Sequence, residues 1–512
     1  MTLADTLLND LATIEPWHLD FYQDLHRHPE LSFQETRTAG LVSDRLTHLG
    51  FELHGGLGGT GLVGILRNGT GPTVLARADM DALPVREATG LPYASTDTAV
   101  DAAGNETPVM HACGHDMHVT CQLAAAQLLA EHQDAWSGTF IAVFQPAEEL
   151  GTGASAMVQD GLAEVIPTPD VALGQHVMGL PHDTVASRPG AALSAADSIR
   201  ITLHGRGTHG SMPHYGIDPV LLGSAVVMRL NAIVSRELPP GHFGVVTVGS
   251  FQSGSKSNVI PETATLLVNL RAYDDRTRRQ LRDAVERIVR AECAASGSPA
   301  PPEFEYTDPF PLTDNDPEAY ERVSAAFTEH FGDKAIVMEP STGSEDFSDI
   351  PRALGVPYLY WIWGGFDPVT YRRAEQEGTL GKVIPGNHAS TFAPVMAPTF
   401  RTGASAMTVA VLSYLPATRD FSMPRDASLT CCRTSPEAAH FPPLETPRAA
   451  RWATSSAACR RAPSTRYSAA VIKLAPGCRR ASASSRRFGQ GATGCLAMNA
   501  RRVVITSFGC SS

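Results

Sequence analysis

Three short apolar runs that end in polar side chains limit most strongly how this 512-residue chain can fold. The runs are TVLARADM (73–80), GTFIAVFQPAEE (138–149) and DVALGQHV (170–177). Continuous apolar runs of this length are typical of strands that are buried on both faces of a parallel sheet. Residues 116–133, between the first two runs, are rich in Ala and Leu and have a helical period. The pattern predicts an α/β fold with helices covering a mixed, mostly parallel sheet.

A change of pattern after residue 190 indicates a smaller domain inserted into the first. The next segments read in the order strand, helix, strand, strand, helix, over 198–207, 215–237, 243–251, 262–274 and 275–295. This order predicts an α+β module. Residues 296–311 are rich in proline and are predicted to return the chain without regular structure.

Four segments follow from these boundaries. We assign residues 1–190 and 306–416 to the main domain, and residues 191–305 to the inserted α+β domain. Residues 417–512 are rich in Arg, Ser and Ala and have no sustained apolar period, so we predict a disordered, low-complexity basic tail.

Charge is distributed unevenly between the tail and the rest of the chain. Residues 419–512 carry 15 basic and four acidic side chains, whereas the remaining residues have a net charge of −23. An acidic body argues against nucleic-acid binding, because phosphates would be repelled. The arginine runs of the tail leave contact with RNA or anionic lipid as the less favoured alternative to a solvated appendage.

Three sequence features bear on the cellular compartment: a signal peptide, a membrane-spanning helix and the number of cysteines. The first 35 residues lack a basic segment followed by an apolar core, and no apolar run approaches the roughly 20 residues of a membrane helix. Only Cys113, Cys121 and Cys293 precede the tail, too few for a disulfide framework. We therefore expect a cytoplasmic protein without membrane association.

Two short motifs carry side chains suited to metal chemistry. In HACGHDMH (111–118), Cys113 and His115 are two residues apart and would point to one side of an extended segment. Glu148 and Glu149 follow an apolar strand, where neighbours project to opposite sides. One carboxylate could bind metal while the other acts as a general base, the alternative being a solvated acidic turn.

Two further histidines could complete such a site. The run GQHV (174–177) places His176 at the end of another predicted strand, and His388 lies in the Gly/Asn turn PGNHAS. A lone histidine at a strand end is usually a hydrogen-bonded core residue. However, open α/β sheets gather ligands at the carboxyl ends of their strands, so convergence on one crevice is expected. Mixed Cys, His and Glu donors suit Zn, Mn, Co or Ni rather than Ca or Mg.

Nine motifs in sequence order resemble a known family over residues 1–416. The chain resembles the di-metal amidohydrolase and peptidase superfamily of aminoacylases and carboxypeptidases, and most of all the branch of hippurate hydrolase and indole-acetyl-amino-acid hydrolases. The matching motifs are LHRHPELSFQE (25–35), ARADMDALPV (76–85), MHACGHDMH (110–118), FQPAEE (144–149), GQHV (174–177), GRGTHGSMPH (205–214), SNVIPETA (257–264), TGSEDFS (342–348) and PGNHASTFAP (385–394).

The resemblance implies a role for each matching residue. It implies that two divalent metal ions are held by Cys113, His115, Glu149, His176 and His388. Glu148 would be the general base, and His209 would steady the tetrahedral intermediate, in dimers often at the partner's active site. Asn258 and Arg271 would bind substrate, and the inserted domain would act as a lid and dimerisation surface of a homodimer or homotetramer.

The implied reaction is hydrolysis of the amide bond of N-acyl amino acids, such as hippurate-like substrates, to a carboxylic acid and an amino acid. A dipeptidase or carboxypeptidase of the same superfamily is the first alternative. A metal carrier without catalysis is a second, which the Glu148–Glu149 pair argues against because a carrier has no use for the unligated carboxylate.

Overall fold

An eight-stranded sheet forms the centre of the main domain in the computed structural model, which describes residues 2–418. The predicted tail lies outside the described residues, apart from its first two positions. The strand order is β1-β2-β6-β3-β7-β18-β8-β17. The strands are β1 (Glu52–Leu57), β2 (Gly61–Asn68), β3 (Thr73–Asp79), β6 (Gly138–Gln145), β7 (Val171–Pro181), β8 (Val185–Ser187), β17 (Ala335–Val337) and β18 (Tyr358–Phe366).

The middle of this sheet is parallel and its margins are mixed. The strands β6, β3, β7 and β18 run parallel to one another. The pairs β1–β2, β2–β6 and β8–β18 are antiparallel. The three apolar runs form β6, β3 and β7, whose strands are almost wholly buried. The predicted mixed, mostly parallel α/β fold is confirmed.

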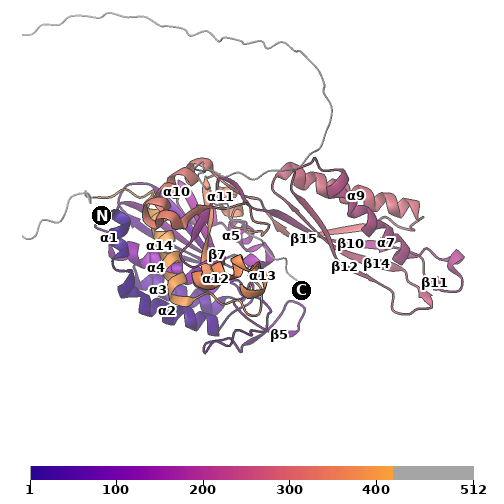
Figure 1. Ribbon diagram of the computed structural model, residues 1–512, viewed down its shortest axis with the longest axis horizontal. Helices are drawn as coiled ribbons and strands as arrows, with labels where there is room; N and C mark the ends of the chain where they lie inside the picture. The colour runs from indigo at the N-terminus through magenta and orange to yellow at the C-terminus, as the bar shows by residue number, and fades with distance from the viewer. Residues whose placement is uncertain (1, 419–512) are drawn as a thin grey trace, which may run out of the picture. The chain divides into compact units, whose positions relative to one another are not determined.

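Helices cover both faces of the sheet because alternate strand residues point to opposite sides. Val74 and Ala76 join the apolar core that includes α4 and α14, whereas Leu75 joins the core on the other face with α5 and α11. Figure 1 shows α4 and α14 side by side on their face. The helices of this domain are α1 (Leu3–Leu8), α2 (Leu11–Arg27), α3 (Thr36–His48), α4 (His115–Glu131), α5 (Gly153–Gln159), α6 (Leu162–Val165), α10 (Pro317–Phe331), α11 (Asp349–Leu354), α12 (Pro368–Gln376), α13 (Leu380–Val383) and α14 (Met396–Leu412).

A four-stranded antiparallel sheet, in the order β12-β14-β10-β15, forms a second core with two long helices on one face (Figure 1). We call residues 195–310 the small module. Its elements are β10 (Ala195–His204), β11 (Thr208–His209), α7 (Pro219–Leu230), α8 (Ala232–Arg236), β12 (Gly244–Ser253), β13 (Val259–Ile260), β14 (Thr263–Ala272), α9 (Asp275–Ala295) and β15 (Glu303–Phe310). Asp274 begins α9 as an N-cap, because its side chain accepts the main-chain N–H of Thr277.

The predicted irregular return over 296–311 is wrong in its second half. Glu303–Phe310 forms β15 at the edge of the small sheet, paired with β10. Pro309 lies near the end of this strand, where register is already irregular. Proline is tolerated at such edge positions because no neighbouring strand needs its missing N–H.

Short pairs of strands and turns complete the described chain. They are β4 (Thr98–Val100) with β5 (Glu106–Pro108), β9 (Gly190–Leu193) with β16 (Thr313–Asn315), and the 3₁₀ turns η1 (Glu148–Leu150), η2 (Pro213–Tyr215) and η3 (Gly332–Lys334). By length and hydropathy alone, Pro219–Arg236 could cross a membrane, with a mean hydropathy of 1.2 over 18 residues. Its inner side chains, including Leu222 and Val226, pack in the core of the small module.

Candidate active site

The candidate site lies where β3, β6 and β7 end. These strands are neighbours and run parallel, so their carboxyl ends meet at one edge of the sheet. Asp79 ends β3 and Glu148 follows β6 after a two-residue link. His176 lies in the middle of β7, which continues to Pro181, so the predicted strand end at His176 is wrong. Three segments distant in sequence thus bring polar side chains to one place.

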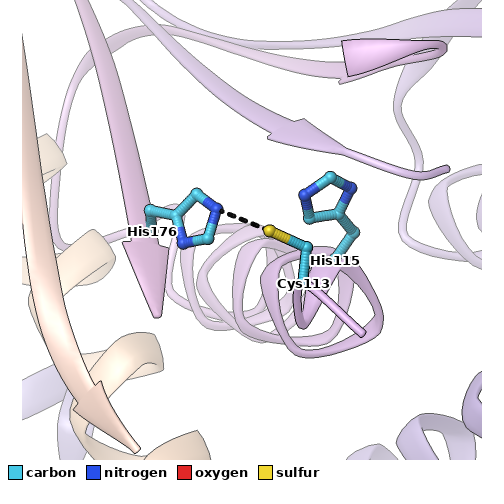
Figure 2. Close-up of side chains that lie close together, drawn as sticks. All are labelled: Cys113, His115 and His176. Atoms are coloured by element: carbon cyan, nitrogen blue, oxygen red, sulfur yellow. Dashed lines mark hydrogen bonds between the residues drawn. The ribbon is translucent and has the colours of Figure 1, made fainter. Parts of the chain in front are cut away.

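Gly114 sets the geometry of the two donors beside it. It begins α4 with φ +85°, a left-handed conformation that favours glycine. A Cβ atom at Gly114 would lie 2.5 Å from Cγ1 of Val177 on β7. The backbone of this turn can therefore pass close to β7, which places Cys113 against His176 while His115 opens the helix (Figure 2).

The turn between β6 and α5 presents the two adjacent glutamates. Ala147 takes a left-handed φ of +50°, and Glu148 and Glu149 follow it in η1. The N–H groups of Glu148 and Glu149 donate to the two carboxylate oxygens of Asp81 at 3.1 and 3.0 Å. The main chain of this turn is therefore fixed by a carboxylate from the segment after β3.

His388 arrives from a loop far along the chain, after α13. Its φ is +70°, and its N–H donates to the carbonyl of Ala112 at 2.8 Å. The side-chain amide of the preceding residue, Asn387, donates to the carbonyls of Cys113 and Val177. These bonds fasten the loop to the segments that carry Cys113 and His176.

The structure brings together all five residues that the resemblance implies as ligands. Sγ of Cys113 lies 3.4 Å from Nε2 of His176 (Figure 2), and Nε2 of His388 lies 3.3 Å from Oε2 of Glu149. Nε2 of His115 lies 3.9 Å from Oε1 of Glu149. These residues form overlapping groups of three. In each group, one donor atom from each residue lies within 4.8 Å of the donor atoms of the other two, which is close enough for the three to bind the same metal ion.

Unsatisfied buried atoms support the fit of a metal to this cluster. Within residues 2–418, Nε2 of His115 and Oε1 of Glu149 are buried and accept or donate no hydrogen bond. Buried polar atoms normally have partners, so these two donor atoms are available to bind a metal ion. Nδ1 of His115 lies 3.2 Å from Oδ1 of Asp81, a carboxylate contact typical of metal-binding histidines.

Burial shifts the pKa values of Glu148 and His176 in opposite directions. Burial, together with the charges of Glu345 and Glu149, raises the pKa of Glu148 well above its usual range. Burial, and then the nearby His118, lower the pKa of His176. A neutral imidazole is the form that binds metal, and a carboxylate with raised proton affinity suits a group that accepts and returns a proton.

A cavity of about 890 Å³ opens in front of the cluster. Cys113, Glu148, Glu149, His176 and His388 all line it, whereas His115 lies buried behind them. Part of the wall is apolar and includes side chains from β7, α12 and the segment around α13, namely Met178, Leu180, Tyr371, Leu380 and Ile384. Polar parts of the wall include Asn269, Arg271 and the loop over residues 341–345.

The three remaining predicted site residues fall in two places. Arg271 lines the cavity and donates to the carbonyl of Thr342 at 2.8 Å and to the hydroxyl of Ser344 at 3.0 Å. His209 and Asn258 are exposed and lie outside the cavity lining. They are neighbours, since β11 pairs with β13 and the N–H of Gly210 donates to the carbonyl of Asn258 at 2.7 Å.

Sequence reasoning assigned no site role to two groups that hold the cluster in place. Nδ1 of His118 lies 2.5 Å from Asp79, and its Nε2 accepts the N–H of Val177 at 3.0 Å, which orders β7 beside His176. Asn387 ties the loop of His388 to two other segments. The only sequence signal for either was its place beside a candidate ligand.

The site and fold agree with the family whose model the chain matches. Residues 75–375 match the model of peptidase family M20/M25/M40. Thermostable carboxypeptidase 2 of Saccharolobus solfataricus is 34% identical over 77% of this chain and 94% of that protein. Hippurate hydrolase of Campylobacter jejuni is 37% identical over 63% of this chain and 82% of that protein.

A solved structure from Bacillus subtilis, described as a dinuclear metal binding peptidase from the M20 family, is 25% identical. It superposes with a TM-score of 0.61 over 78% of this chain and 99% of that chain. The chain therefore belongs to peptidase family M20/M25/M40, which confirms the resemblance seen in the sequence. It is a hydrolase of amide bonds.

Proposed function

We propose that the chain is a metal-dependent amidohydrolase that cleaves N-acyl amino acids to a carboxylic acid and an amino acid. The observation that carries this proposal is the position of Glu148. Its carboxylate lines the cavity beside Glu149, while the unsatisfied Nε2 of His115 lies 3.8 Å from its Oε2. A general base next to a donor cluster is the arrangement that hydrolysis by activated water needs.

The residues divide into ligands, a base and groups that orient substrate. Cys113, His115, Glu149, His176 and His388 would hold two divalent ions of Zn, Mn, Co or Ni. Such ions, when bound, polarise a substrate carbonyl and lower the pKa of water. Glu148 would accept a proton from the attacking water on a carboxylate oxygen and return it to the leaving amine.

The apolar and polar parts of the cavity wall support an acyl amino acid as substrate. His176, Met178 and Leu180 alternate along β7, so the apolar wall continues directly from a candidate ligand. An aromatic or aliphatic acyl group would pack there. Arg271 and Asn269, in the polar part of the wall, would bind the carboxylate of the amino acid. A hippurate-like substrate has these two ends.

A homodimer or homotetramer would complete the site. His209 and Asn258 lie outside this chain's own cavity, so their implied roles need the cavity of a partner subunit. The small module carries exposed apolar side chains on α7, with Leu221 71% and Met228 75% exposed. Its edge strand β12 has no neighbour on one side within residues 2–418. These features support a lid and dimerisation role.

We place the enzyme in the cytoplasm. Cys113, Cys121 and Cys293 form no disulfide within residues 2–418, as is usual for proteins of a reducing compartment.

A substrate panel with a base-deficient variant tests the proposal. The wild type with added Zn, Mn, Co or Ni should hydrolyse N-benzoylglycine and other N-acyl amino acids. Glu148→Gln should retain its metal but lose about 100-fold or more of kcat, because general-base catalysis is removed. Full activity of Glu148→Gln would contradict the base assignment. Preferred cleavage of dipeptides or of C-terminal residues would favour a dipeptidase or carboxypeptidase, as the similarity to a carboxypeptidase allows.

A further inference from the structure

Glu35 is a buried carboxyl group that contacts the turn carrying the two active-site glutamates. It lies just before α3 and is 0% exposed. Its Oε1 accepts the N–H of Ala147 at 2.8 Å, across 112 positions of sequence. Its Oε2 accepts the hydroxyl of Thr60 at 2.5 Å. Glu35 is therefore anchored in the body of the domain at one oxygen and holds the turn at the other.

The same oxygen holds a second residue with unusual backbone. Phe33 has φ +63° and donates its N–H to Oε1 of Glu35 at 3.0 Å. Ala147, the other donor, has φ +50°. Four non-glycine residues of the described chain have a positive φ, and these are two of them. The left-handed region is disfavoured for residues with a Cβ, so the surroundings must hold it.

Two buried carboxyl groups bind three consecutive N–H groups of this turn. Glu35 accepts from Ala147, and Asp81 accepts from Glu148 and Glu149. The two anchors approach from separate segments of the chain. A change of φ at Ala147 would rotate both glutamates, because each follows it directly in the main chain.

We propose that Glu35 is a positioning residue that fixes Ala147 in its left-handed conformation and thereby aims Glu148 into the cavity. This inference rests on the proposed function, because it takes Glu148 as the base. Glu35 is not among the residues that line the cavity. It acts through the main chain rather than on the substrate.

A neutral side chain of the same shape should serve this role. Burial, and then the charge of Asp81, raise the pKa of Glu35 to about 7. In Glu35→Gln, the amide oxygen can accept from Phe33 and Ala147, and the amide nitrogen can donate to the hydroxyl of Thr60. Glu35→Ala removes all three bonds.

Steady-state kinetics of the full-length chain on N-benzoylglycine with added metal test the proposal. Glu35→Ala should lower kcat by about 10- to 100-fold, because a small misplacement of a catalytic group is costly. Its KM and metal content should change little, and Glu35→Gln should retain most of the activity. Glu35→Ala combined with Ala147→Gly should recover several-fold in kcat, because glycine adopts a positive φ without a steric penalty.

Hydrogen–deuterium exchange of the segment 144–151 gives a readout that does not depend on activity. Exchange should be faster in Glu35→Ala than in the wild type and in Glu35→Gln. Glu15→Ala is a matched control, because it also removes a mostly buried carboxylate. Glu15 pairs with Arg401, which is not part of the turn. If Glu35→Ala does not fold, Thr60→Val, which removes only the bond to Oε2, should give a smaller change of the same kind.

Unchanged exchange and unchanged kcat in Glu35→Ala would overturn the positioning role. A loss that neither Glu35→Gln nor Ala147→Gly restores would also overturn it. If the wild type hydrolyses no N-acyl amino acid, the proposed function fails. The exchange comparison then still decides whether Glu35 holds the turn.

Discussion

Nδ1 of His115 lies 3.2 Å from Oδ1 of Asp81, which leaves Nε2 of the same ring facing Glu148 and Glu149. Asp81 also accepts the N–H groups of both glutamates. One carboxylate thus orients a candidate ligand and the turn that carries a second candidate ligand and the proposed base. The geometry of the site depends on this shared contact.

Asp81→Ala should therefore weaken metal binding. Loss of a carboxylate that orients a metal-binding histidine typically lowers metal affinity by about 10- to 100-fold. Titration of the metal-free protein with Zn or Mn, followed by calorimetry, measures the change. Asp97→Ala is the matched control, because Asp97 pairs with the exposed His28 at 3.0 Å. Equal affinity for Asp81→Ala and the wild type would contradict the orienting role.

Gly114→Ala should destabilise the fold and disturb the site. The left-handed backbone alone costs an alanine about 1–2 kcal/mol, and contact with Val177 adds to it. Urea denaturation measures the free energy of unfolding. Gly355→Ala isolates the backbone contribution, because Gly355 has φ +69° and no atom within 4 Å of a built Cβ. The prediction fails if the two variants lose the same stability.

His26 should make stability depend on pH between about 6.5 and 9. Burial disfavours the charged ring, but hydrogen bonds with Asp116 and Glu87 raise the pKa of His26 to about 9. The rings of Tyr22 and Tyr93 pack against it. Because the folded pKa exceeds the unfolded value, the stabilisation is complete below pH 6.5 and disappears as pH rises through 9. It amounts to roughly 3 kcal/mol.

Thermal unfolding of His26→Gln against pH checks this prediction. The difference in stability from the wild type should be largest near pH 6 and should shrink by pH 9.5. His28→Gln, whose side chain is 41% exposed, serves as the control. A difference that is constant across this range would refute the protonated His26.

Removal of residues 419–512 should leave hydrolysis unchanged within about twofold, as expected for a terminal segment outside the site. All residues that line the cavity lie between Cys113 and His388. The truncation keeps Thr418, whose N–H donates to the carbonyl of Ala135 at 3.0 Å. Comparison of kcat/KM between the full and the shortened chain measures the effect of the truncation. A large loss would show that the tail contributes to the active enzyme.

Sequence reasoning reached the sheet and the donor cluster because both leave local signals. Apolar runs marked β3, β6 and β7, and polar residues after or within these runs marked Glu148 and His176. The helix predicted over 275–295, which is α9, was equally clear, because its apolar period is a local signal. Features that depend on residues within one segment were therefore predictable.

Other features depend on contacts between distant segments and left no such signal. The bond from Glu35 to Ala147 spans 112 positions, and that from Asn387 to Cys113 spans 274. The strand β15 was hidden by prolines that only an edge position tolerates. The exposed placement of His209 and Asn258 also could not be read from their motifs.

As a proposed metal ligand that lines the cavity, Cys113 would give this enzyme a chemical sensitivity that carboxylate and imidazole donors alone would not have. Peroxide converts an accessible thiolate first to a sulfenic acid, which reductants reverse, and then to irreversible higher oxides. Either product would replace a soft sulfur donor with oxygen. Turnover would then respond to the oxidative state of the cell as well as to the supply of substrate.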